Sequence, residues 1–198
     1  MDRKEEFTTA LEPILPEQFS KSSRCITSHC EKHSKEIVHT FLEAFKAVVE
    51  QTTILQDEKK KGKIKYILFS HLYSSMFLQH YLIRIDLMDP AFYNDSSHAV
   101  SYWDARYIYE FFEEDVEAIR KKLGKNFPRI REYEADYIRY AYAPYYHRLT
   151  KAFLQAMFEE AVSESNFLPQ RVRLDRCARI LFGEYMGEAD VLFHLGEE

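Results

Sequence analysis

The amino-acid sequence predicts a mainly α-helical protein, folded as an irregular bundle of five or six helices. Glycine and proline are scarce, at 5 and 6 residues of 198, whereas a long all-β chain needs many turn residues. Apolar residues recur at three-, four- and seven-residue spacings, which is the period of amphipathic helices. The composition, 46% hydrophobic and 30% charged, is that of a globular protein. We therefore expect a single domain over residues 1–198, with residues 1–17 as a loosely attached N-terminal segment.

The first expected helix covers residues 20–56. Its apolar residues share one helical face: Ile26, Cys30, Ile37, Phe41, Ala44, Phe45 and Val48. The lysine-rich stretch "KKKGKIK" (59–65) follows, with Gly62 inside it. We interpret this run as a solvated connection between helices.

The segment 65–88 has two different patterns. Residues 65–77 are apolar on nearly every side of a helical wheel, which predicts a buried helix. Residues 80–88 instead alternate, with Tyr81, Ile83, Ile85 and Leu87 at period two. Such alternation indicates a minor β element there. The C-terminal segment 168–195 is the other place for one, because Gly183 and Gly187 weaken a continuous helix and permit a hairpin.

Two further helices are expected, at 101–123 and from 128 to about 164. Ser101 and Asp104 resemble a capping box at the start of the first helix, and Gly124 is a natural C-cap. Pro128 suits the first turn of the second helix.

The second of these helices contains "EYEADYIRYAYAPYYHRL" (132–149), which holds six tyrosines. The helical period divides them into a core set, Tyr142, Tyr145 and Tyr146, and an opposite set, Tyr133, Tyr137 and Tyr140. Tyrosine buries its ring and still offers a hydroxyl, so both core and binding surfaces use it. Only the opposite set needs a functional explanation.

Pro144 interrupts the hydrogen bonding of this helix and predicts a kink. A kink beside Arg139 and Arg148 would leave a concave, partly polar surface, and arginine pairs well with carboxylates and phosphates. We therefore expect a binding site for a small anionic ligand. Its expected residues are Tyr133, Tyr137, Tyr140, Arg139 and Arg148. A core or a subunit interface is the alternative explanation of the same tyrosines.

A second candidate site lies in "CITSHCEKHSKE" (25–36), which concentrates metal-ligating residue types. On one helix, Cys25, His29, His33 and Glu36 fall within an arc of about 80°. Thiolate, imidazole and carboxylate suit zinc or another transition metal. One straight helix rarely surrounds an ion, so a second helix would have to supply ligands. The alternative is a solvated polar face without metal.

Charge and motifs exclude several function classes. The net charge of −5 does not favour nucleic-acid binding. No apolar run reaches the ~18 residues that predict a transmembrane helix, and no leader-like apolar region follows "MDRKEEF". The three cysteines predict reduced thiols in a cytoplasmic protein. Phosphate-binding, dinucleotide-binding and nucleophile-elbow motifs are missing.

The sequence thus favours a non-catalytic module that binds a ligand or a protein partner through aromatic helix faces, without a cofactor. A homo-oligomer fits the same pattern. The alternative is a metal-dependent enzyme or metal-binding protein built on the histidines of the first long helix. Whether the protein is an enzyme is left open.

Overall fold

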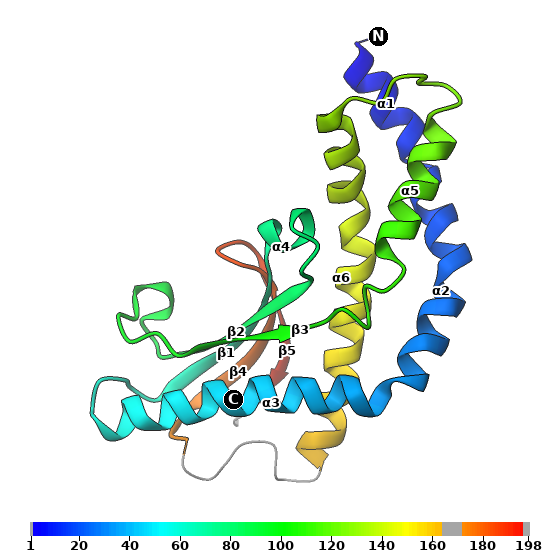
Figure 1. The fold of residues 1–198 in the computed structure, drawn as a ribbon. Helices are drawn as coiled ribbons and strands as arrows, with labels where there is room; N and C mark the ends of the chain where they lie inside the picture. The colour runs from blue at the N-terminus through cyan, green and yellow to red at the C-terminus, as the bar shows by residue number, and fades with distance from the viewer. Residues whose placement is uncertain (1, 164–171, 196–198) are drawn as a thin grey trace.

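A computed structural model, which describes residues 2–163 and 172–195, has an α/β fold (Figure 1). In chain order the described elements are α1 (Arg3–Leu11), α2 (Ile14–Lys32), α3 (Ser34–Asp57), β1 (Ile64–His71), α4 (Tyr73–Phe77), β2 (Leu82–Met88), the 3-10 turn η1 (Phe92–Asn94), β3 (Val100–Asp104), α5 (Phe112–Leu123), α6 (Glu132–Ser163), β4 (Leu174–Glu184) and β5 (Ala189–His194). Parts of the expected segments 128–164 and 168–195 lie outside the described residues.

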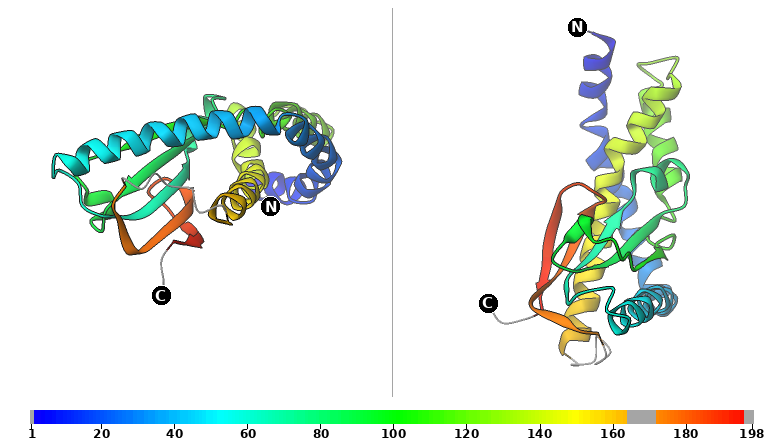
Figure 2. Two further views of the ribbon diagram at one scale, coloured as in Figure 1. Left: turned by 90° about the horizontal axis from the view of Figure 1, so that it is seen from below. Right: turned by 90° about the vertical axis from the view of Figure 1, so that its left-hand side faces the viewer.

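The elements form an L-shaped molecule (Figure 1). The upright arm contains α1, α2, α5 and the first part of α6, and the foot contains α3 and the sheet. Seen from below, α3 runs along one side of the sheet while the arm helices are viewed end-on (Figure 2). The corner of the L lies at His33, whose φ of −104° and ψ of 17° break the helix. The expected helix 20–56 is therefore two helices, α2 and α3.

A five-stranded sheet, which the sequence did not predict, stands beside the helices at the centre of the fold. Its strand order is β3-β2-β1-β4-β5, in which β1 and β4 are parallel and the other pairs are antiparallel. The prediction of a mainly α, all-helical bundle is therefore wrong. The sheet is the centre of the fold, not the minor β element that was expected.

The central strand β1 explains the error. Ile67 and Phe69 of this strand belong to the main core, whereas Leu68 packs with Met88 and Leu181 on the opposite face of the sheet. A strand that is buried on both faces is apolar at almost every position. Over a short run this pattern cannot be distinguished from a buried helix.

Other predicted boundaries also change. The alternation at 80–88 does mark a strand, β2. Residues 101–104, expected to begin a helix, belong to strand β3, and helix α5 begins only at Phe112. The Ser101 hydroxyl donates to the Ala44 carbonyl of α3 instead of capping a helix. Gly124 is the C-cap of α5, and the C-terminal glycines lie in a β4–β5 hairpin.

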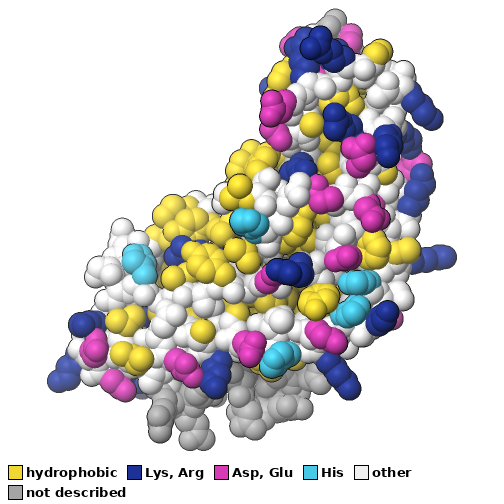
Figure 3. Space-filling view, viewed as in Figure 1, with side chains coloured by type: hydrophobic (Ala, Val, Ile, Leu, Met, Phe, Trp, Pro, Cys, Tyr) yellow, Lys and Arg dark blue, Asp and Glu magenta, His cyan; other side chains and the backbone are white. Residues whose placement is uncertain are grey.

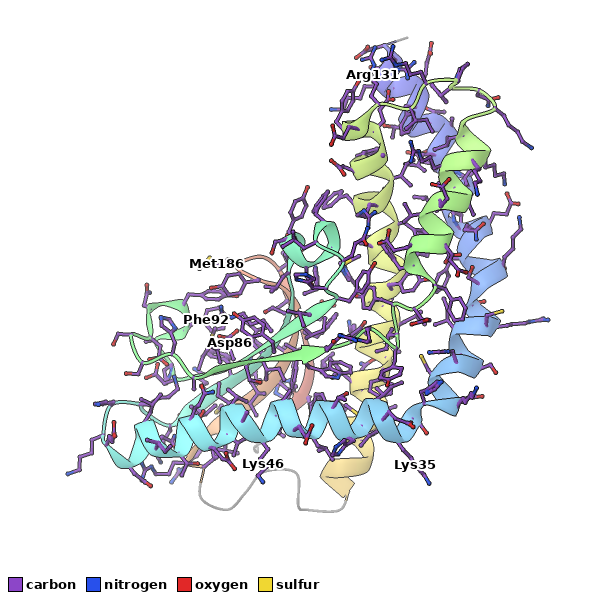
Figure 4. The ribbon with its side chains drawn as sticks, viewed as in Figure 1. Lys35, Lys46, Asp86, Phe92, Arg131 and Met186 are labelled. Atoms are coloured by element: carbon purple, nitrogen blue, oxygen red, sulfur yellow. The ribbon has the colours of Figure 1, made fainter. Side chains whose placement is uncertain are left out.

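The main core lies between the sheet, α3 and α6. An aromatic cluster holds these elements together: the ring centroid of Phe41 in α3 is 5.4 Å from that of Trp103 in β3 and 5.7 Å from that of Phe69 in β1. Such edge and tilted contacts add to the hydrophobic gain of burying large rings. In α3, Lys35 and Lys46 point away from the sheet (Figure 4).

Helix α6 connects the arm to the foot. Its 32 residues correspond to a length of about 48 Å, and it continues through Pro144. At the far end of the arm, Phe7 and Leu11 of α1 are buried. In the part of the chain that the structure describes, no helix has both the length and the apolar character that crossing a membrane requires.

Candidate functional site

A cavity of about 430 Å³ lies where the foot meets the arm. It is bounded by the end of β1, by α4, by the middle of α6 and by the β4–β5 hairpin. Strands β1 and β4 are parallel, and their carboxyl ends coincide because His71 is paired in register with Glu184. The carboxyl ends of parallel strands are a frequent place for ligands in α/β proteins.

Two stacked histidines form one wall of this cavity. The ring centroids of His71, at the end of β1, and His147, in α6, are 3.7 Å apart, with 22° between the ring planes. Burial lowers the pKa of His71 to about 4. Burial, with a smaller contribution from His71, lowers the pKa of His147 to about 3. Both imidazoles are therefore neutral at pH 7.

Each of these histidines has a buried nitrogen without a hydrogen-bond partner among the described residues, Nδ1 of His71 and Nε2 of His147. A buried polar atom without a partner costs free energy, so such atoms are rare in folded proteins. Here two of them lie side by side in a cavity wall. Small residues of α6 beside them, Ala141 and Ala143, also line the cavity.

The rim of the cavity carries charges of both signs. Lys151 forms an ion pair with Asp190, with 2.6 Å between Nζ and Oδ2. The Arg148 guanidinium lies 4.6 Å from the centre of the Tyr145 ring. Glu184 and Glu188 also line the cavity, and no ion pair to either is found in the described ranges. These two carboxylates at the rim therefore remain free to pair with a positively charged group.

A groove of about 360 Å³ continues from the cavity along α6 towards the end of the arm. It is lined by Tyr73, Phe77, Tyr133, Asp136, Tyr137 and Tyr140, and three of these residues, Tyr73, Phe77 and Tyr140, also line the cavity. The Tyr73 ring centroid is 4.8 Å from that of Phe77 and 5.4 Å from that of Tyr140. Apolar side chains gather in the inner corner of the L (Figure 3).

The structure brings together most of the predicted tyrosine site. Tyr133, Tyr137 and Tyr140 share the groove, and Arg148 lines the adjoining cavity. Arg139, in contrast, lines neither the groove nor the cavity. Its guanidinium forms a two-pronged ion pair with Glu113 and donates to the Met76 carbonyl at 3.3 Å.

The sequence did not identify the histidine pair. His71 was missed because residues 65–77 resemble a buried helix, so His71 was not expected to end a strand. His147 lies inside the quoted tyrosine stretch, but nothing in the chain links it to a residue so distant in sequence. Only the parallel pairing of β1 with β4, with α6 packed beside them, brings the two rings together.

The core set of tyrosines surrounds a different buried group, Asp115 of α5. Its carboxylate accepts hydrogen bonds from the hydroxyls of Tyr142 and Tyr146 at 2.7 and 2.8 Å. It also accepts hydrogen bonds from Gln18 of α2, at 2.8 Å, and from the Ser22 hydroxyl. Both tyrosines have a strongly raised pKa because they are buried beside this carboxylate. The cluster thus fastens α2, α5 and α6 to one another.

The predicted metal ligands lie at the corner of the L. His29 and His33 have ring centroids 4.5 Å apart, and His33 stacks on Tyr107 at 5.3 Å. Cys25 is exposed, and Glu36 lies beyond the break at His33, in α3. Within the described ranges, no group of three or more His, Cys, Asp or Glu residues is arranged to hold a metal ion. The metal site, and the metal-dependent enzyme built on it, stay predictions.

A polar cluster also lies on the face of the sheet that is turned away from α3. Arg84 forms a bidentate ion pair with Asp86, and the Tyr185 ring lies 4.5 Å from its guanidinium. Asp86, Phe92 and Met186 lie together on this side of the sheet (Figure 4) and line a cavity of only about 30 Å³. That volume holds only one or two water molecules, so this cluster is a weaker candidate for a ligand site than the larger cavity.

Comparisons of the chain with protein-family models, with curated proteins and with solved structures found no match. The functional argument therefore rests on the geometry of the cavity and the groove.

Proposed function

We propose that this protein is a small-molecule-binding module whose ligand occupies the cavity between β1, α6 and the β4–β5 hairpin. The observation that carries the proposal is the stacked pair of neutral histidines, each with a buried nitrogen that lacks a partner, in the wall of a 430 Å³ cavity. Ligand sites have this character: a concave, mostly apolar space of some hundreds of Å³ with few polar groups.

The chemistry of the pair indicates what part of a ligand it would bind. A neutral imidazole has one nitrogen that donates and one that accepts a hydrogen bond. Both residues line the cavity, and we propose that a bound ligand meets these unpartnered nitrogens. A ligand with an N–H or O–H group then supplies a hydrogen bond that the protein does not make by itself. This hydrogen bond compensates for the free energy that the protein loses by burying the nitrogens without a partner.

Binding also fits the lining better than catalysis does. The pKa values of His71 and His147, about 4 and about 3, are far below neutral pH, so neither is an effective general base there. A small-molecule-binding role agrees with the ligand-binding module that the sequence favours.

The test is a titration of the protein with a panel of small amines, carboxylates and amides, observed through the imidazole carbon–proton NMR signals. We expect at least one class to shift the signals of His71 and His147 and to leave those of the exposed His39 and His80 in place. Ala141→Trp, which fills the cavity, should abolish the shifts. Ala47→Trp, on the exposed side of α3, is the matched control and should preserve them.

Two results would overturn the proposal. One is a panel in which no compound at millimolar concentration moves either histidine signal. The other is a set of shifts that Ala141→Trp leaves unchanged, because the compound would then bind elsewhere.

A further inference from the structure

The cavity and the tyrosine groove adjoin each other along α6, and the two together are called the channel below. Tyr73, Phe77 and Tyr140 line both hollows and lie where the two meet. Asp136 lies in the groove, and His147 in the cavity. Eleven residues of helix separate these two positions, which corresponds to about 16 Å along the helix axis. A ligand that fills the whole channel is therefore long and narrow.

Carboxylates are found at both ends of this channel and aromatic rings between them. Asp136 is at the groove end, and Glu184 and Glu188 are at the cavity end. In the described part of the chain, none of these three side chains forms an ion pair or a side-chain hydrogen bond. Tyr73 and Tyr140, between the ends, are about half exposed, at 55% and 51%. Aromatic faces attract cations, as carboxylates do.

Two positive charges near the channel are paired with carboxylates: Lys151 with Asp190 and Arg139 with Glu113. Arg148 lies against the Tyr145 ring and keeps its charge. Among the described lining residues, the three unpaired carboxylates Asp136, Glu184 and Glu188 outnumber this one unpaired cation, which favours a cationic ligand over the anionic one that the two arginines suggest in the sequence. The neutral histidines add acceptors for N–H donors, and they carry no charge that would repel a cation.

We propose that the channel binds a linear aliphatic polyamine, with an ammonium group at each end and its methylene chain against the tyrosines. The carboxylates at the two ends match the terminal ammonium groups, the rings match the methylenes and any inner ammonium, and the length matches an extended chain of about 16 Å. This assignment rests on the proposed small-molecule-binding function and specifies its ligand class.

Isothermal titration calorimetry with spermine tests the assignment. We expect 1:1 binding, with butylamine, which reaches only one end of the channel, binding about 100-fold more weakly. Asp136→Asn and Glu184→Gln should each weaken spermine binding about tenfold, because each removes one charge-assisted contact. Glu31→Gln is the matched control, because Glu31 is an exposed residue of α2 that lines neither hollow. It should leave the affinity for spermine unchanged.

The outcomes separate this assignment from the proposed function. Spermine that fails to bind, or binds equally well to Asp136→Asn, Glu184→Gln and wild type, overturns the polyamine assignment. If octanoate binds instead, and Ala141→Trp abolishes that binding, the ligand is an anion while the ligand-binding function stands. If neither compound binds and no member of the NMR panel shifts the histidines, both proposals fail.

Discussion

Tyr146 and His147 are consecutive residues of α6, yet they belong to two buried polar clusters of opposite character. The Tyr146 hydroxyl donates to Asp115, whose carboxylate accepts four hydrogen bonds from α2 and α6. His147 stacks on His71 and has a nitrogen without a partner. The first cluster satisfies its own hydrogen-bonding capacity and the second does not. Buried groups that satisfy one another stabilise the fold, whereas unsatisfied ones in a cavity point to a ligand.

The largest effect should follow from breaking the satisfied cluster. Asp115→Asn removes the negative charge and replaces one acceptor oxygen with an NH2 donor. Either the two tyrosine hydroxyls, which share Oδ2, or the Gln18 and Ser22 donors, which share Oδ1, then lose their acceptor. Hydrogen bonds to charged groups contribute about 1.5–3 kcal/mol each, so we expect the free energy of unfolding to fall by about 3 kcal/mol or more. Urea denaturation measures this loss.

Asp136→Asn is the control for that measurement, because Asp136 is exposed and forms no ion pair within the described residues. It should change the free energy of unfolding by no more than about 0.5 kcal/mol. A loss below about 1 kcal/mol for Asp115→Asn would show that the cluster is not a structural clamp.

The histidine pair should make stability depend on pH in the acidic range. The pKa values of His71 and His147 in the folded protein, about 4 and about 3, lie below the ordinary value of 6.5. The unfolded chain therefore takes up protons first as the pH falls. Stability is complete above pH 6.5 and declines as the pH falls towards 4. Each histidine contributes at most about 1.4 kcal/mol per pH unit, and less to the extent that water reaches the rings.

The carboxylates Glu184, Glu188 and Asp190 also line the cavity, so the effect of the histidines is measured as a difference between two proteins. We expect the loss of unfolding free energy between pH 7 and pH 5 to be smaller in His147→Phe than in wild type. The same loss in both proteins would contradict a depressed pKa in the pair.

The smallest effect on stability should come from removing the unsatisfied group at pH 7. His147→Phe keeps an aromatic ring against His71 and eliminates a buried nitrogen that has no partner. Replacing such a group with an apolar one of similar shape is close to neutral or stabilising, so we expect a change between zero and a gain of about 1 kcal/mol. Urea denaturation provides the measurement, with the exposed His80→Phe as control.

A loss of more than about 2 kcal/mol in His147→Phe would remove the contrast between the clusters, because it would show that the imidazole has a structural role. Spermine binding should weaken in the same variant. If the variant is stable but binds spermine weakly, then His147 serves ligand binding, whereas Asp115 serves folding.

The sequence predicted local features well and the sheet poorly. The helical period correctly separated buried Tyr142 and Tyr146 from exposed Tyr133 and Tyr140, because side chains on one helix follow a fixed geometry. The alternation at 80–88 likewise marked a strand. Strand β1 was not recognised because burial on both faces removes the alternation that identifies strands.

The candidate site was predictable only on its helical side. The tyrosine set lies on α6 and was found from one segment of sequence. The remaining residues, including His71, Tyr73 and Glu184, come from β1, α4 and β4, and only the tertiary fold places them beside α6. The ion pair of Arg139 was likewise not predictable, because its partner Glu113 lies on another helix and the helical period of α6 carries no information about it.

The pairing of β1 with β4 also has a consequence for how the chain folds during its synthesis. Ile64 pairs with Leu174, and α4, α5 and α6 all lie between them in the sequence. During synthesis, β1 is complete well before β4 exists, so one edge of the central strand stays open until Leu174–Glu184 has been made. Contacts between such distant segments form slowly, and an open edge is prone to pair with other chains. Because the β4–β5 hairpin closes that edge through β4 and also supplies Glu184 and Glu188 to the cavity, a nascent chain gains protection from aggregation and completes the cavity in the same step.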